Sequence, residues 1–317
     1  MAFLASFKIA GAGILQIFLL GLAGFILVKK NILGIQSLDV LSRLVVEVTL
    51  PLLIFSQLIK DFSFGLYPNW WFFPLLSILI TLAGLTLGYL FAWFIDGPQH
   101  KAQFLSLVAF QNSGYLPLAM FSVMLSGEKL SAMLVYLFLF LLGFNLIIWS
   151  FGVYMLSFHE SKKFELASLF SPPVVAIIAS LILVFLGLNK IIPEVILKPI
   201  HMVGDCTLPL AMFVVGGSLA LIELRNVDKK AMFFMALAKL IILPALGLFL
   251  VIKFKAPELL GLLIVMQLAV PPATSLSVIT RHYKKEDFLI SQGVFVGHII
   301  GLLTLPLFLS LYMAMVY

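Results

Sequence analysis

Ten apolar segments of about 20 residues each, separated by short polar stretches, follow one another along this 317-residue chain. A helix of that length is long enough to cross the hydrocarbon core of a bilayer. Only 11% of the residues are charged, whereas an ordinary soluble domain carries about 25%. The sequence therefore predicts an all-α polytopic membrane protein.

The spans divide equally between the two halves of the chain. The ten ranges are 7–28, 39–59, 70–95, 102–126, 131–157, 172–188, 196–222, 229–252, 257–280 and 288–315.

The first apolar run is followed by Lys29 and Lys30 and is too long for the apolar part of a signal peptide. We therefore expect it to stay in the mature protein as the first helix.

The chain also repeats itself at half its length. The segment Thr49-Leu50-Pro51-Leu52 returns as Thr207-Leu208-Pro209-Leu210, at a spacing of 158 residues. Each half holds five spans, an odd number, so the second half must enter the membrane from the opposite side. We therefore expect an inverted repeat, with residues 1–158 as the first unit, 159–171 as a connecting loop and 172–317 as the second unit.

The distribution of Lys and Arg predicts the orientation. Twelve of these 20 residues fall in loops or helix ends on one face and seven on the other, and the richer face is expected to be cytoplasmic. Both termini then lie outside the plasma (inner) membrane. We therefore relate the net charge of +6 to membrane orientation and expect no nucleic-acid partner. The single cysteine, Cys206, excludes an intrachain disulfide and is expected to be a small buried residue.

Polar residues and prolines interrupt two spans at matching depths. The fourth span contains Asn112, Ser113 and Gly114 near its middle and then Pro117. Proline lacks a backbone donor and disfavours helix at the residue before it, so a helix break is expected at Pro117.

The ninth span contains Val270, Pro271 and Pro272, followed by Thr274 and Ser275, and a break is expected at the two prolines. Matching breaks in two inverted halves are typical of secondary transporters. If the breaks cross, two helix N-termini converge and form an anion site without a basic side chain. Asn112, Ser113, Thr274 and Ser275 would add hydrogen bonds. The alternative is that the prolines only shape helix packing.

Three charged residues within the spans are candidates for ion coupling or charge pairing. Glu47 and Asp205 lie two residues before the two repeated motifs. Each either couples an ion to transport or is hydrated and paired near a helix end. The i, i+4 neighbours available for pairing are Arg43 for Glu47 and His201 for Asp205. Lys239 lies inside the eighth span, where it either neutralises an anionic substrate or pairs with a carboxylate.

Other polar and small residues of the spans have weaker signals. Asn145 is a midspan amide, either a substrate ligand or a contact between helices. His298 is expected to be an interior, hydrogen-bonded histidine. Gly293, Gly297 and Gly301 form a stripe that allows close helix packing. No nucleotide-binding, HExxH or GxSxG motif occurs, so we expect no enzyme, no metal and no cofactor beyond a coupling proton or sodium ion.

Three short motifs together resemble the auxin efflux carrier family, which includes plant auxin exporters and bacterial malate and malonate permeases. They are 42–56 around the first Thr-Leu-Pro-Leu, Gln111 to Pro117, and Val270 to Thr274. The resemblance covers the whole chain in length and helix order. The long cytoplasmic loop of the plant exporters is absent, and the third span lacks their acidic and basic pair.

The resemblance implies a fold like that of bile acid and sodium–proton carriers. Spans 1, 2, 6 and 7 would form a scaffold, and spans 3–5 and 8–10 a mobile transport domain with spans 4 and 9 crossed. It also implies an organic anion whose carboxylate lies near Asn112 and Asn145, in a site that includes Ser113, Gly114, Val270, Pro271, Thr274 and Ser275. A homodimer through spans 2 and 7 is implied as well.

Three functions are therefore open. The first is a carrier of a small carboxylate that works by elevator-type motion. The second is a sodium-coupled symporter of the bile-acid type, because neutral oxygens at the crossing also suit a cation. The third is a membrane sensor that does not transport.

Overall fold

The computed structural model describes residues 2–157, 169–222, 224, 227–282 and 288–316, and these residues form helices without any strand. Most of the predicted loop 159–171 lies outside the described residues. Six of the described helical segments are long and apolar enough to cross a membrane. They are Ala10–Lys29, Phe72–Ala92, Gly127–Leu156, Glu194–Ala220, Lys229–Lys253 and Phe288–Val316. The chain is thus a helical membrane protein with several spans, as the sequence predicts.

The remaining predicted spans are shorter or interrupted helices. In the first half the order is α1 (Ala2–Lys29), α2 (Ile35–Leu44), the π-helix η1 (Val45–Thr49), α3 (Leu50–Asp61), α4 (Phe72–Ala92), α5 (Pro98–Ala109), α6 (Tyr115–Met124), α7 (Gly127–Ile147), the π-helix η2 (Ile148–Gly152) and α8 (Val153–Leu156).

The second half begins with α9 (Pro172–Phe185), which is only 14 residues long. It continues with the 3₁₀-helix η4 (Leu188–Ile191), α10 (Glu194–Asp205), α11 (Thr207–Ala220), α12 (Lys229–Ala236), the π-helix η5 (Leu237–Ile242), α13 (Leu243–Lys253), α14 (Glu258–Ala269), α15 (Ser275–His282) and α16 (Phe288–Val316).

The repeated Thr-Leu-Pro-Leu motif distorts the helix in both halves. A proline inside a helix cannot donate to the carbonyl four residues before it, and its ring collides with that carbonyl. Pro51 therefore follows the π-helix η1, and Pro209 follows the interruption at Cys206 between α10 and α11.

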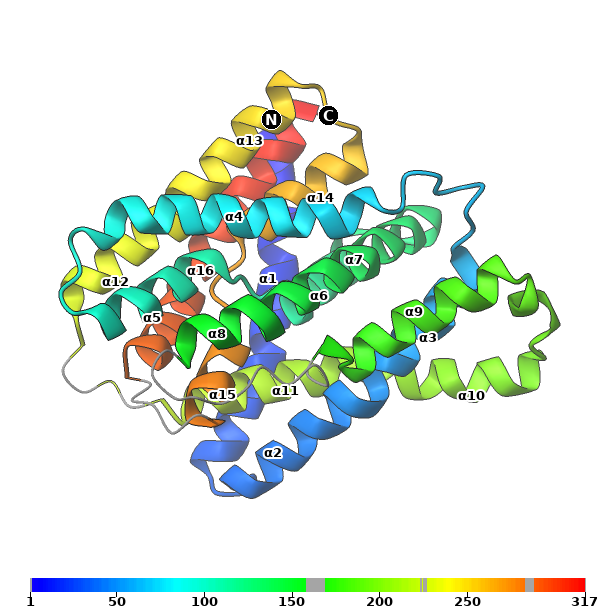
Figure 1. The fold of residues 1–317 in the computed structure, drawn as a ribbon, viewed down its shortest axis with the longest axis horizontal. Helices are drawn as coiled ribbons and strands as arrows, with labels where there is room; N and C mark the ends of the chain where they lie inside the picture. The colour runs from blue at the N-terminus through cyan, green and yellow to red at the C-terminus, as the bar shows by residue number, and fades with distance from the viewer. Residues whose placement is uncertain (1, 158–168, 223, 225–226, 283–287, 317) are drawn as a thin grey trace.

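The helices pack in two groups that meet along α1 and α7. In one group, α1 and α2 pack on α11, and α3 packs on α9 and α10. In the other group, α4 packs on α5 and α7, and α14 packs on α13 and α16. In Figure 1, α3, α9 and α10 lie together at one end of the molecule, away from α5 and α12. The N- and C-terminal ends lie near each other beside α13.

Glycine lets the backbones of α1 and α11 touch. A Cβ atom on Gly216 would collide with the carbonyl of Gly21, and one on Gly24 would collide with the carbonyl of Phe213. Close approach through small residues replaces the hydrophobic effect as the main source of helix association in a membrane.

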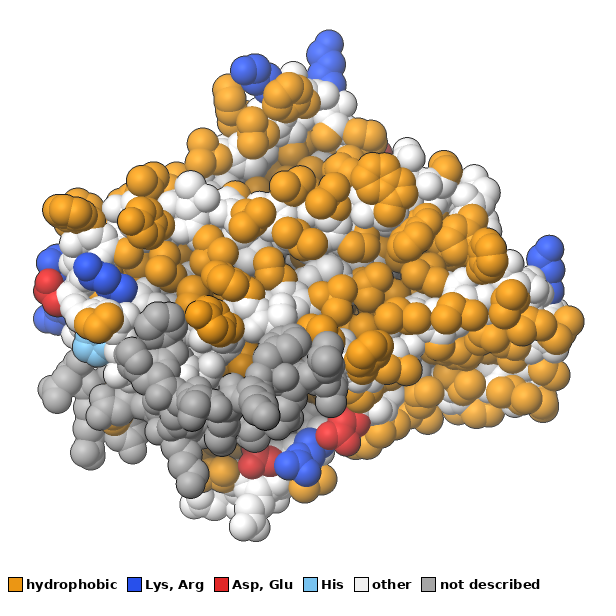
Figure 2. All heavy atoms as spheres, in the orientation of Figure 1, with side chains coloured by type: hydrophobic (Ala, Val, Ile, Leu, Met, Phe, Trp, Pro, Cys, Tyr) orange, Lys and Arg blue, Asp and Glu red, His pale blue; other side chains and the backbone are white. Residues whose placement is uncertain are grey.

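The outer surface is largely apolar. On the face shown in Figure 2, hydrophobic side chains cover most of the molecule and the charged side chains gather at its edges. An apolar band with charges at its margins is the arrangement expected of a protein surrounded by lipid.

Candidate functional site

The first interruption separates α5 from α6. Helix α5 ends at Ala109 and α6 begins at Tyr115 after Gly114. The break expected at Pro117 is therefore misplaced, because Pro117 lies within the first turn of α6. The missing N–H of a proline costs nothing in the first turn, where the backbone N–H groups have no helical acceptor.

The second interruption separates α14, which ends at Ala269, from α15, which begins at Ser275. Pro271 and Pro272 lie within this extended segment. Val270 is the first residue of this segment, and it has extended backbone angles and is fully buried. Both helices are therefore interrupted for about five residues inside the protein.

The two interruptions are hydrogen-bonded to each other. The Asn112 N–H donates to the Pro271 carbonyl at 2.9 Å, and the Ala273 N–H donates to the Phe110 carbonyl at 2.9 Å. Gln111 and Pro272 form an antiparallel bridge between them. These bonds supply acceptors and donors that the helices have lost, which a lipid environment cannot provide.

A side chain reinforces the contact. The Gln267 Nε2 group, on the last turn of α14, donates to the Ser113 carbonyl at 3.1 Å. Gln267 is fully buried, and it is not among the site residues predicted from the sequence. The signal for it in the sequence is a polar side chain in the last turn before a helix break.

A cavity of about 140 Å³ lies against this crossing. Its walls come from η1, α3, α7, η2 and α9 as well as from the two interruptions. Six of the predicted site residues line it, namely Asn112, Ser113, Gly114, Asn145, Thr274 and Ser275. Val270 and Pro271 do not, and Pro271 instead faces a second cavity on the other side of the crossing. We call the first space the polar cavity.

Several buried polar atoms at the polar cavity have no hydrogen-bond partner among the residues that the structure describes. These atoms are the nitrogen and oxygen of the Gln111 amide and the hydroxyl oxygens of Ser113 and Ser171. All three residues line the cavity. A buried polar group without a partner costs about 1–3 kcal/mol, so such groups mark places where a ligand or water completes the bonding. Gln111 and Ser171 were not predicted as site residues, although Gln111 adjoins the predicted Asn112.

The electrostatics of the polar cavity come from the backbone. No charged side chain lines it among the described residues. The first helical bond of α6 runs from the Leu118 N–H to the Gly114 carbonyl, so the N–H groups before Leu118 have no acceptor within the helix. The N-termini of α6 and α15 both begin at this cavity, and each carries roughly half a positive charge.

The second space, which we call the apolar cavity, measures about 270 Å³ and lies between α1, α6, α11 and α16. His298 is the one titratable residue in its described lining. Some lining positions of the two cavities are 158 residues apart: Leu141 with Ile299, Phe144 with Leu302, Ser113 with Pro271, and Leu116 with Thr274. The spacing of the repeat thus relates the two cavities.

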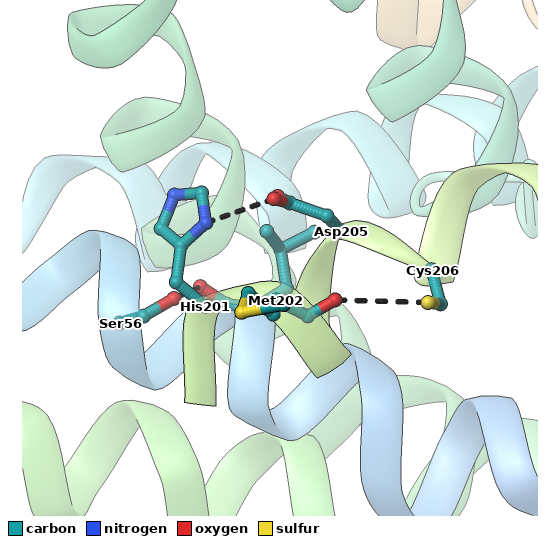
Figure 3. Close-up of polar contacts among 6 residues, drawn as sticks. Ser56, His201, Met202, Asp205 and Cys206 are labelled. Carbon is teal, nitrogen blue, oxygen red and sulfur yellow. Dashed lines mark hydrogen bonds and ion pairs between the residues drawn. The ribbon is translucent and has the colours of Figure 1, made fainter. Parts of the chain in front are cut away.

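Glu47 and Asp205 lie outside both linings. Glu47 and its neighbour Arg43 are exposed, and no ion pair joins them within the described part of the chain. His201 Nδ1 contacts Asp205 Oδ2 at 2.9 Å, so the expected i, i+4 pair does form, on an exposed face of α10 (Figure 3).

Two further residues differ from expectation. Cys206 is exposed and its Sγ lies 3.6 Å from the Met202 carbonyl, because α10 ends at this point and turns the side chain outward (Figure 3). Lys239 is 1% exposed, lines neither cavity and has neither an ion pair nor a hydrogen bond within the described residues. The carboxylate pairing expected for Lys239 therefore does not form among the described residues, and its contact with an anionic substrate stays a prediction.

The glycine stripe of α16 packs on the crossing, as the sequence predicts for close helix contact. A Cβ atom on Gly297 would lie 2.6 Å from Pro272 Cδ, whereas one on Gly301 would lie 3.6 Å from Pro271. The stripe therefore holds α16 against the second interruption.

We expect Gly297→Ala to destabilise the protein by about 1–3 kcal/mol, because the new methyl group displaces Pro272. Gly301→Ala is the matched control and should change stability by less than about 0.5 kcal/mol, since 3.6 Å is ordinary contact. Thermal unfolding of the two variants in detergent measures the difference. Equal unfolding midpoints would show that α16 does not press on the interruption.

Comparison with known proteins identifies the family. The model of a family described as membrane transport protein matches residues 11–309. An uncharacterized transporter of Methanothermobacter thermautotrophicus is 27% identical over 299 residues, which are 93% of this chain and 95% of that protein.

Two plant proteins match over shorter segments. Protein PIN-LIKES 6 of Arabidopsis thaliana is 30% identical over 124 residues, which are 38% of this chain and 29% of that protein. Protein PIN-LIKES 2 of the same plant is 32% identical over 95 residues, 30% of this chain and 21% of that protein. The matched segments thus span less than a third of either plant protein. Because the family model extends over nearly the whole chain, this protein belongs to the auxin efflux carrier family of membrane transport proteins.

Proposed function

We propose that this transporter moves a small organic anion, held by its carboxylate in the polar cavity. The main support is the set of unpartnered buried atoms on Gln111, Ser113 and Ser171, which together line one space. Two helix N-termini and the amide of Asn145 add donors to the same space. A carboxylate accepts several hydrogen bonds at once and fits this donor-rich setting.

The size of the cavity favours a small substrate. At about 140 Å³ it is well below the roughly 300–1,000 Å³ of pockets that hold drug-sized molecules. An acid of a few heavy atoms therefore suits it better than a bile acid. The absence of acidic side chains from its described lining also weakens the sodium-symporter alternative, although neutral oxygens remain available to a cation.

We further propose elevator-type motion in an inverted five-plus-five repeat. The polar cavity has walls from both helix groups, with Val46, Leu50 and Pro173 on one side and Asn112, Asn145 and Thr274 on the other. Spans 1, 2, 6 and 7 would be the scaffold and spans 3–5 and 8–10 the transport domain. A substrate held between two bodies is released on either side when one slides past the other.

The proposed setting is the plasma (inner) membrane of a bacterium, with both termini outside and two copies joined through spans 2 and 7. The nearness of the two termini beside α13 fits the placement of both on one side (Figure 1). Measuring the mass of the purified protein in detergent tests the dimer, and a mass of one chain contradicts it.

Uptake into proteoliposomes tests the function itself. A panel of mono- and dicarboxylates is offered while proton and sodium gradients are imposed separately. We expect accumulation of at least one small acid, with no requirement for sodium. Strict sodium dependence would favour the symporter alternative, and tight binding without uptake would favour a sensor.

A further inference from the structure

His298 contacts Asn112 from the opposite side of the crossing. Asn112 Nδ2 lies 3.4 Å from His298 Nε2, and His298 Nδ1 lies 2.8 Å from the Val294 carbonyl. Asn112 lines the polar cavity, whereas His298 lines the apolar cavity. One hydrogen-bonded chain therefore runs from the backbone of α16 through His298 to a wall of the polar cavity.

The Val294 contact determines what the other nitrogen of His298 does. A carbonyl only accepts hydrogen bonds, so Nδ1 must carry the proton. In neutral His298, Nε2 is then an acceptor, and it receives a hydrogen bond from Asn112 Nδ2. In charged His298 both nitrogens are donors, and Nε2–H requires an acceptor instead.

The amide of Asn112 meets both requirements, but only by reversing. Opposite neutral His298 it presents Nδ2 and turns its Oδ1 away. Opposite charged His298 it presents Oδ1 and turns both N–H groups away. The Oδ1 atom has no hydrogen bond among the described residues, so no second hydrogen bond there opposes the reversal of the amide.

We propose that His298 sets which end of the Asn112 amide faces the polar cavity, so that a proton taken from water onto His298 Nε2 strengthens anion binding there. The inference rests on the proposed function, and it names His298 as a positioning residue and the proton as the coupling ion. An exposed Oδ1 repels a carboxylate, and two N–H groups attract it. A proton and an anion then bind cooperatively, each favouring the other by the same factor.

No charged group that the structure describes is bonded to His298. Within the described part of the chain, neither an ion pair nor a hydrogen bond joins His298 to a titratable side chain of the helices around it. Those helices carry Lys8 and Lys29 on α1, His100 and Lys101 on α5, Tyr115 on α6, Lys229 and Lys230 on α12, Lys239 on η5, Lys253 on α13 and Glu258 on α14, while the side chains of Arg281 and His282 on α15 are not described.

Malonate binding to the purified protein between pH 5 and 8 tests the proposal. The variant His298→Gln keeps an acceptor for Asn112 but cannot titrate, and Glu47→Gln removes a competing titratable group. The probe's own titration affects all three proteins equally. As the pH falls, we expect malonate affinity of the wild type to rise relative to His298→Gln by up to about tenfold per pH unit, with Glu47→Gln behaving as the wild type.

A pH dependence that persists in His298→Gln, or that disappears in Glu47→Gln, overturns the proposal while leaving anion binding intact. Failure of the wild type to bind malonate or any other acid of the panel at any pH removes the proposed function as well. A measurement on the wild type alone guards against a variant that does not fold. In ¹⁵N spectra of labelled histidine, malonate should increase the protonated fraction of His298 at fixed pH, and an unchanged fraction contradicts the coupling.

Discussion

Asn112→Asp is expected to weaken anion binding at least about 100-fold. The substitution keeps the shape of the side chain but places a negative charge at the wall of the polar cavity. Like charges brought together at a binding site cost several kcal/mol, and about 2.8 kcal/mol corresponds to a factor of 100. Calorimetric titration of the purified protein with the transported acid measures the loss.

A matched control separates this local repulsion from the change in net charge. Asn69 is exposed in the turn between α3 and α4, so Asn69→Asp adds the same charge far from the crossing. We expect it to bind the acid as the wild type does. If Asn112→Asp also binds normally, the carboxylate of the substrate does not contact Asn112.

Lys239→Met is expected to raise the free energy of unfolding by about 1–4 kcal/mol. Lys239 is 1% exposed and has no hydrogen bond or ion pair among the described residues, so folding removes its ammonium group from water without compensation. Methionine fills a similar volume without a charge, and replacing buried charges by apolar groups commonly stabilises proteins by this amount. The midpoint of thermal unfolding reports the gain.

Lys230→Met serves as the control, because Lys230 is exposed in the first turn of α12 and its charge stays hydrated. It should leave the midpoint unchanged. A midpoint for Lys239→Met at or below that of the wild type would mean that Lys239 is stabilised by an interaction absent from this conformation. Uptake assays on Lys239→Met then show whether the charge of Lys239 is needed for transport. Loss of uptake would mean that the wild type keeps this charge for transport at the expense of stability.

Local signals in the sequence predicted much of the fold and part of the site. Pro271 and Pro272, with the polar residues from Asn112 to Gly114, are unfavourable within a membrane helix, so their positions indicated both interruptions. The break predicted at Pro117 is misplaced because proline is also common in the first turn of a helix. The sequence does not distinguish a proline that ends one helix from a proline that begins the next. The repeat and its spacing pointed to the pairing of the interruptions.

Long-range contacts were beyond the reach of the sequence. The contact of Asn112 with His298 joins residues 186 positions apart, and it depends on how α16 rotates against the crossing. Lys239 is a second example, because a buried lysine normally has a partner, and only the packing of η5 shows that no described residue provides one. Exposure of Cys206 likewise follows from the local end of α10, which composition does not indicate.

The main-chain bonds between the two interruptions have a consequence for how such a protein diversifies. The bonds Asn112 N–H to Pro271 and Ala273 N–H to Phe110 use backbone atoms only, so most side-chain replacements leave them in place. Side chains at the cavity wall can then change one at a time without dismantling the crossing. Selection for a new substrate would therefore act on residues 111–114 and 273–275 while the architecture stays the same, which lets duplicated genes acquire different cargoes from a single scaffold.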